Sequence, residues 1–376
     1  MASTIDFSSL TEKDDLTKVL GNYWPGIQIY YPPIKYNPLD GSYETIEQAQ
    51  LRLQKHAYKT NAHTLLFDLE DGCRKKAMSR ELLIQELPKF PERNFQIAVR
   101  INQFRTEEYE QDLKMLRQIH QYIDVITLSK AGELYGDAEI RDLSSWLVSL
   151  DSNITIQPII EHPKSLQIVS QLMDYSTVNH VVFGIHDFSK AMAYTITPDN
   201  WINELKTFFN ILTMEARICG KGVIGGVEVM LTPHNMPEKC VEQKDIRRWL
   251  DLHGDKASRC VYNHAKTETA MGLTGKQVIH PNHINLCKVA FTPSPKQVEH
   301  SVAILQAAMD ADALLGGAIR FEGEMLDPPM FGKALQNILR AYALRTLAPQ
   351  DQLFALKVLS KLPVHTIREN WPYGQI

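Results

Sequence analysis

The sequence lacks the features that mark a secreted disulfide scaffold or a membrane protein. Its five cysteines are an odd number, are widely spaced and contain no Cys-x-x-Cys pair, which is typical of reduced thiols rather than a disulfide framework. No apolar run approaches the roughly 18 to 20 residues that a bilayer-spanning helix needs. The first residues also lack the basic and apolar regions of a signal peptide. We therefore expect a cytoplasmic protein with no membrane association.

A strong charge of one sign is also missing. The chain has 40 basic and 44 acidic residues, for a formal charge of −4, so no overall field would draw it to nucleic acid. We expect no nucleic-acid partner. With 376 residues, 44% of them hydrophobic, the chain can bury a large core. Its length suits two domains or one α/β barrel with additional segments.

Eight short apolar runs alternate with longer segments of helical periodicity, which predicts parallel strands joined by helices. Continuous apolar runs are expected where both faces of a strand are buried. We therefore predict an α/β fold, a (β/α)₈ TIM barrel over residues 1–290 with an insertion at about 233–271, followed by a C-terminal helical lobe over 291–376. The predicted strands lie at about 27–31, 64–67, 96–101, 125–128, 155–160, 180–183, 222–227 and 277–279.

Polar side chains follow most of these predicted strands. The active site of a (β/α)₈ barrel is built at the carboxyl ends of its strands, so these positions carry the functional prediction. A single carboxylate there can simply cap the next helix, and a histidine such as His280 can be structural. A buried guanidinium, in contrast, must be paired. The polar segments are DLED at 68–71, RIN at 100–102, SK at 129–130, EH at 161–162, HD at 186–187 and HP at 280–281.

Two of these carboxylates, Glu161 and Asp187, follow neighbouring strands and suit a divalent cation. Mg²⁺ commonly takes one or two protein carboxylates and leaves its other positions to substrate and water. Arg100 would hold an anionic substrate group with its two-pronged guanidinium. A metal beside such an arginine can polarise a carbonyl and stabilise an enolate, the charge that carbon–carbon bond cleavage next to a carbonyl produces.

Seven motifs, in order, resemble those of the HpcH/HpaI aldolase/citrate lyase family, in its citrate lyase β-subunit-like and malyl-CoA lyase branch. The resemblance covers roughly residues 64–345. The motifs are FDLEDG at 67–72, VRIN at 99–102, LSK at 128–130, IE at 160–161, GIHDF at 184–188, GKQVIHP at 275–281 and FEGEMLD at 321–327.

The resemblance implies a Mg²⁺-dependent lyase, a homotrimer or homohexamer, that cleaves or forms 3-hydroxyacyl-CoA thioesters by Claisen-type chemistry, with a keto acid and an acyl-CoA as the small molecules it handles. It implies that Glu161 and Asp187 are the metal ligands and that Arg100 binds the keto-acid portion. Asp327 would be the acid/base residue, delivered to a neighbouring subunit. Three further residues are implied in the site: Asp71 as a catalytic residue in the second shell, and Glu70 and Lys130 in substrate binding.

The sequence also departs from this pattern. The segment 30–41 replaces the usual first motif, Ser129 stands where the family generally has proline, and the insertion at 233–271 is additional. These departures keep an alternative open, a metal-dependent aldolase that acts on free keto acids without CoA. A third hypothesis is a catalytically silent binding subunit, against which the complete set of Arg100, Glu161, Asp187 and Asp327 argues.

Overall fold

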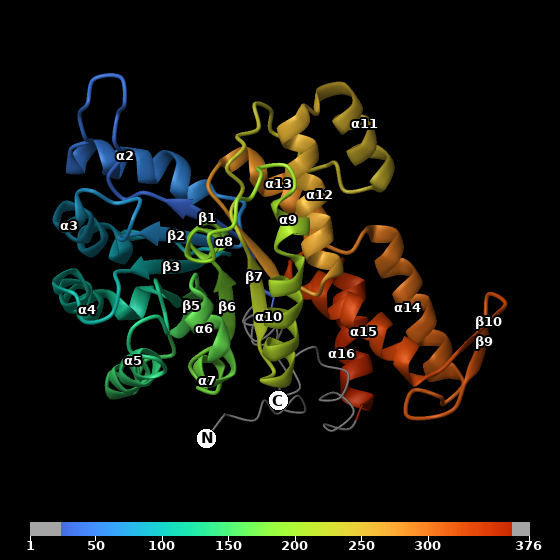
Figure 1. Ribbon diagram of the computed structural model, residues 1–376. Coiled ribbons are helices and arrows are strands. Elements are labelled where there is room, and N and C mark those ends of the chain that lie inside the picture. Colours follow the sequence, from blue (N-terminus) through green and yellow to red (C-terminus); the bar gives the residue numbers. More distant parts are fainter. Residues whose placement is uncertain (1–23, 363–376) are drawn as a thin grey trace.

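Eight parallel strands form a closed barrel with helices on its outside (Figure 1). The computed structural model describes residues 24–362. Each strand pairs with the next along the chain, and β8 pairs with β1 to close the barrel. The predicted (β/α)₈ fold is confirmed. The strands are β1 (Gly26–Tyr31), β2 (Thr64–Asp68), β3 (Gln96–Ile101), β4 (Val125–Leu128), β5 (Thr155–Ile160), β6 (His180–Phe183), β7 (Gly222–Gly225) and β8 (Gly275–Val278).

The outer helices begin at recognisable capping residues. Thr106 accepts a hydrogen bond from the backbone N–H of Tyr109 at the start of α4, and Thr45 forms a reciprocal capping box with Gln48 at the start of α2. Such caps satisfy backbone donors that a helix end leaves unpaired. The barrel helices are α2 (Ile46–His56), α3 (Lys76–Glu86), α4 (Glu107–Ile119), α5 (Ala138–Ser149), α6 (Pro163–Gln167), α7 (Val169–Met173), α8 (Ile185–Ala191), α9 (Trp201–Glu204), α10 (Lys206–Ile218), α11 (Gln243–His253), α12 (Lys256–Ala270) and α13 (Pro281–Phe291).

The interior of the barrel contains a polar layer. The side-chain amide of Gln28 on β1 donates to Gln157 on β5 over 3.1 Å. Because β1 and β5 are not neighbours in the sheet, this bond crosses the barrel. Gln277 on β8 donates to Gln28 over 3.2 Å. The three buried glutamines satisfy one another, as buried polar groups must.

The connection from β7 to β8 holds α11 and α12 and includes the segment 233–271. A fully buried ammonium group fastens it to the barrel. Lys276 Nζ donates to the carbonyl of Gly226 over 2.7 Å and forms ion pairs with Glu228 at 3.1 Å and Glu268 at 2.9 Å. All three charged side chains have no exposed surface. Because Glu268 lies on α12 and Gly226 follows β7, this network ties the connection to both β7 and β8.

A second hydrophobic cluster, separate from that around the barrel, forms the C-terminal lobe. It is built from α14 (Pro295–Asp310), α15 (Pro328–Ala343) and α16 (Pro349–Lys361), and Trp24 before β1 packs into it. Two short antiparallel strands, β9 (Ile319–Phe321) and β10 (Glu324–Leu326), form a hairpin at the outer edge of this lobe (Figure 1). Asp327 follows β10 and is exposed at the N-terminus of α15.

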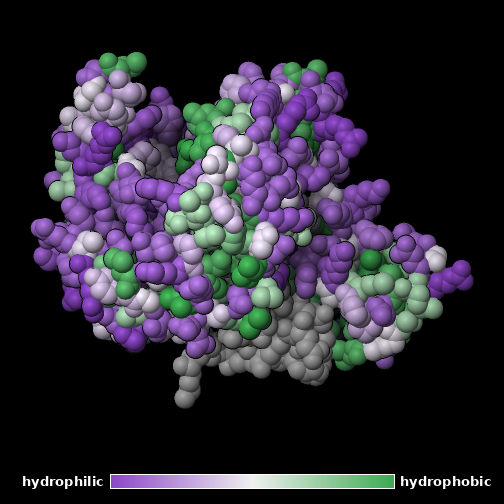
Figure 2. All heavy atoms as spheres, in the orientation of Figure 1, coloured by the Kyte–Doolittle hydropathy of each residue, from purple (hydrophilic) through white to green (hydrophobic). Residues whose placement is uncertain are grey.

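The surface seen in Figure 2 is mainly hydrophilic, and its hydrophobic residues are gathered in small patches. Between Trp24 and Leu362, no helix combines the length and the apolar character that crossing a bilayer requires.

Candidate active site at the barrel mouth

A cavity of about 360 Å³ opens at the carboxyl ends of the strands, which is where (β/α)₈ barrels place their chemistry. Charged side chains from β2, β3 and the segments after β5 and β6 line it, and apolar groups fill the spaces between them. The lining residues are Tyr30, Pro32, Asp68, Gly72, Arg100, Ile159, Glu161, Phe183, Gly184, Ile185, His186, Asp187, Val227, Gln277 and Ile279.

A larger cavity, about 910 Å³, lies at the opposite end of the barrel. Segments that precede strands line it, such as Trp24 and Pro25 before β1 and Asn94 and Phe95 before β3. That end of a (β/α)₈ barrel is associated with stability rather than catalysis. We therefore assign the active site to the smaller cavity.

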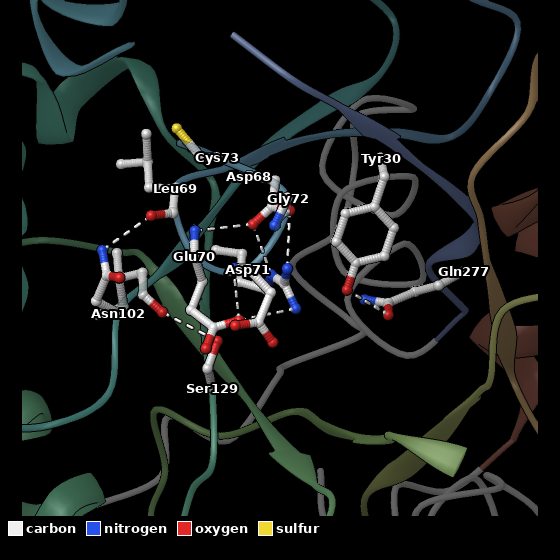
Figure 3. Close-up of polar contacts among 12 residues, drawn as sticks. Tyr30, Asp68, Leu69, Glu70, Asp71, Gly72, Cys73, Asn102, Ser129 and Gln277 are labelled. Atoms are coloured by element: carbon white, nitrogen blue, oxygen red, sulfur yellow. Dashed lines mark hydrogen bonds and ion pairs between the residues drawn. The ribbon is translucent and has the colours of Figure 1, made fainter. Parts of the chain in front are cut away.

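Two carboxylates hold Arg100 on one side of the mouth, and Figure 3 shows their side chains, Asp68 and Glu70. Its Nε and Nη2 donate to the two carboxylate oxygens of Asp68 over 2.7 and 2.8 Å, and its Nη1 lies 3.3 Å from Glu70. The register explains the first pair, because β2 and β3 align Asp68 with Arg100. Of the five N–H donors of a guanidinium, these contacts use three, so two can still bind a ligand.

A tight turn after β2 supports this arrangement. The two oxygens of Asp68 also accept the backbone N–H groups of Glu70 at 2.9 Å and Gly72 at 3.1 Å. Lys130, which follows β4, pairs with Glu70 and lies 3.5 Å from Asp71. Burial raises the pKa of Glu70. In Figure 3 these acidic side chains form one group, opposite Tyr30.

Glu161 is buried beside a second carboxylate, Asp187. Burial, and to a lesser degree the charge of Asp187, raises the pKa of Glu161 to about 8, although its Oε1 accepts the backbone N–H of Lys130. Gly184 makes this packing possible, because a Cβ there would lie 2.7 Å from the Cβ of Glu161. Among the residues described, Asp187 makes no side-chain hydrogen bond or ion pair. Both carboxylates are therefore available to a cation.

The charge balance of the mouth also favours a cation. Its carboxylates are Asp68, Glu70, Asp71, Glu161 and Asp187, and its cationic groups are Arg100 and Lys130, which leaves a formal excess of three negative charges. A divalent cation would offset most of this excess. Within the described part of the chain no cluster of three or more His, Cys, Asp or Glu side chains could hold a metal. Two carboxylates beside a cavity suit Mg²⁺, which can take its other ligands from substrate and water.

The structure brings together six of the seven residues predicted from the sequence. Arg100, Glu161 and Asp187 line the cavity, and Glu70, Asp71 and Lys130 join them through ion pairs; Asp327 lies apart on the C-terminal lobe. Their roles stay predictions. Sequence reasoning named Asp68 among the polar residues at strand ends without giving it a role, and it did not assign Tyr30 or Gln277 to the site. The neighbouring positions of β2 and β3 would have indicated Asp68 as a partner for Arg100, whereas no sequence signal marks the other two.

Comparison with known proteins identifies the family of the chain. Residues 46–246, more than half of the chain, match the model of the family described as HpcH/HpaI aldolase/citrate lyase. The chain is 40% identical over 75 residues to the mitochondrial citramalyl-CoA lyase of Rattus norvegicus. That match covers 20% of this chain and 22% of the relative. The chain is also 23% identical over 303 residues to the citrate lyase subunit beta of Leuconostoc mesenteroides subsp. cremoris. This second match covers 78% of this chain and 87% of the relative.

Among solved structures, the fold resembles protein CitE from Mycobacterium tuberculosis, which was solved in complex with magnesium, acetoacetate and coenzyme A. The TM-score is 0.57 at 18% sequence identity, over 84% of this chain and 97% of that one. At 18% identity the similarity shows a shared fold. Together with the family match, it confirms the resemblance drawn from the seven motifs.

Proposed function

The chain belongs to the HpcH/HpaI aldolase/citrate lyase family, and we propose that it is a magnesium-dependent carbon–carbon lyase that cleaves or forms a 3-hydroxyacyl-CoA thioester. The observation that carries this proposal is the pair Glu161 and Asp187 at neighbouring strand ends. Glu161 is buried and Asp187 is partly exposed, and both line the same cavity as Arg100. The similarity to a citramalyl-CoA lyase and to a fold that binds magnesium and coenzyme A supports it.

Mg²⁺, held by Glu161 and Asp187, would supply Lewis-acid polarisation of a substrate oxygen. The side chains of the mouth would bind and orient the substrate. Arg100 would direct its two remaining N–H donors at the substrate carboxylate or carbonyl, and Asp68 would keep the guanidinium in place. A donor fixed in this way favours charge that develops on the reacting carbonyl. Glu70 and Lys130 would bind substrate at the same rim, with Asp71 supporting them.

We place Asp327 as the acid/base residue that protonates the thioester enolate, contributed by another copy of the chain. In one chain it is exposed on the C-terminal lobe and does not line the mouth cavity, so it would act only across a subunit interface. A homotrimer or homohexamer would supply such an interface. Mixing two inactive variants, Asp327→Asn and Glu161→Gln, should restore part of the activity, because some mixed interfaces then combine an intact Asp327 with an intact metal pair. No recovery after verified subunit exchange would contradict this placement.

The free-substrate aldolase is the second candidate. The observation that favours it is the hairpin between β1 and α2, where Tyr36 and Tyr43 pair across the turn in the segment that departs from the family's first motif. Thermal-shift titration with acetyl-CoA, CoA, pyruvate and oxaloacetate, each with and without Mg²⁺, separates the two, because a bound ligand raises native-state stability. Stabilisation by acetyl-CoA supports the thioester lyase. Stabilisation by Mg²⁺ with a keto acid and by no CoA compound would replace it with the aldolase.

A further inference from the structure

Tyr30 lines the mouth cavity, and its phenol hydrogen is already used in a hydrogen bond. The residue lies on β1 and lines the cavity, and its hydroxyl donates to Oε1 of Gln277 on β8 over 2.9 Å. Figure 3 shows the phenol and the amide meeting across from the acidic group around Asp68. None of the roles assigned above uses this pair.

Three glutamine amides inside the barrel bond in one direction, which ends at Tyr30. The amide nitrogen of Gln277 donates to Gln28, and that of Gln28 donates to Gln157. Because the NH₂ group of Gln277 is turned toward Gln28, its carbonyl oxygen faces Tyr30. A carbonyl oxygen can only accept, so the phenol must donate. Its oxygen is then left with lone pairs and no free hydrogen toward the cavity.

The phenol also stays neutral. Burial raises the pKa of Tyr30, although the nearby positive charge of Arg100 opposes this effect. The guanidinium carbon of Arg100 lies 5.2 Å from the centre of the Tyr30 ring, so a group bound by Arg100 would lie close to the phenol. A neutral phenol whose hydrogen is committed can accept a hydrogen bond from a ligand but cannot serve as a base at ordinary pH.

We propose that Tyr30 is a specificity-determining residue that recognises the substrate's hydroxyl group by accepting a hydrogen bond from it. This inference rests on the proposed function, in which the substrate is a hydroxy acid derivative and one product is a keto acid. A ketone oxygen has no hydrogen to offer, and it would meet the lone pairs of the phenol. The site therefore binds the hydroxy form better than the keto form, which also assists release of the keto product.

Malate and oxaloacetate are matched probes for this inference, because they share a carbon skeleton and differ in a hydroxyl against a ketone. Calorimetric titration of the full chain with each, in the presence of Mg²⁺, gives the ratio of the two affinities. Tyr30→Phe removes only the oxygen, and we expect it to lower the preference for malate by about 3- to 10-fold, the usual range for one neutral hydrogen bond. The oxaloacetate affinity should stay the same or rise.

Tyr31→Phe is the control, since Tyr31 lies on the same strand but donates to the carbonyl of Arg52 and does not line the cavity. It should leave the affinity ratio unchanged. A general loss of packing in Tyr30→Phe would weaken both ligands alike, and that result would overturn the inference while leaving the proposed function intact. Failure of the wild-type chain to bind either ligand with Mg²⁺ would also overturn the inference, whereas the proposed function is decided separately, by cleavage of CoA thioesters.

Discussion

Replacing Glu161 with glutamine should stabilise the metal-free protein at alkaline pH. The pKa of Glu161 rises from 4.5 to about 8 on folding, chiefly through burial. Between pH 4.5 and about 8, Glu161 is therefore protonated in the folded chain and ionised in the unfolded chain. The free energy of unfolding falls as the pH rises through this range, because the unfolded chain binds fewer protons. At about 1.4 kcal/mol for each pH unit, the ionised Glu161 costs at most about 5 kcal/mol above pH 8. Glutamine keeps an oxygen for the backbone N–H of Lys130 and removes the charge.

Urea unfolding of the wild type and of Glu161→Gln, at pH values from 5 to 9 in EDTA, measures this difference. The variant should lose less stability with rising pH, by an amount that approaches a few kcal/mol at pH 9. Added Mg²⁺ should then stabilise the wild type at pH 8 and have little effect on the variant. If the free energy of unfolding changed with pH in parallel for the two proteins, or if Mg²⁺ stabilised both equally, Glu161 would not be an unpaired buried carboxylate that binds a cation.

Three further substitutions test other parts of the site. Arg100→Lys loses the two-pronged contact with its partner carboxylate and should lower kcat/KM for lyase activity at least about 100-fold; a change within threefold would contradict its assigned role. Gly184→Ala would force a Cβ to within 2.7 Å of the Glu161 Cβ and should weaken Mg²⁺ binding about 10- to 100-fold in calorimetry. Lys276→Met leaves the buried Glu268 without its ion-pair partner, while Glu228 keeps Trp201 and His264, and should cost about 3 to 5 kcal/mol in urea unfolding. Lys256→Met, at an exposed ion pair, should leave the unfolding midpoint nearly unchanged, and equal effects of the two lysine substitutions would contradict the reasoning.

The barrel could be predicted from the sequence because its strands are short apolar runs that are buried on both faces. The run at 96–101 became β3 with the same limits, and those at 125–128 and 155–160 became β4 and β5. The limits of β7 and β8 were less accurate. β8 begins at Gly275 and includes the buried Lys276, and both residues precede the short run at 277–279 from which the strand was predicted. Its partners, Glu228 after β7 and Glu268 on α12, come from different segments that meet Lys276 only in the folded chain.

The charged residues of the mouth could be predicted for a similar reason. Arg100, Glu161 and Asp187 lie in or just after strands, so assigning the strands places these side chains at one end of the barrel. The orientation of individual polar groups could not be predicted. The hydroxyl of Tyr30 donates its hydrogen to Gln277 because three glutamines from β1, β5 and β8 form hydrogen bonds in one direction. That arrangement exists only once the barrel closes.

Mg²⁺-dependent cleavage of a 3-hydroxyacyl-CoA thioester tests the account most directly. A panel of such thioesters should be incubated with the wild-type chain and with Asp187→Asn, in Mg²⁺ or in EDTA, while release of keto acid and acyl-CoA is followed. We predict cleavage of at least one thioester by the wild type in Mg²⁺, and none in EDTA or by the variant. Cleavage that persists in EDTA, or a panel left uncut while free keto acids are turned over, would contradict the proposed lyase.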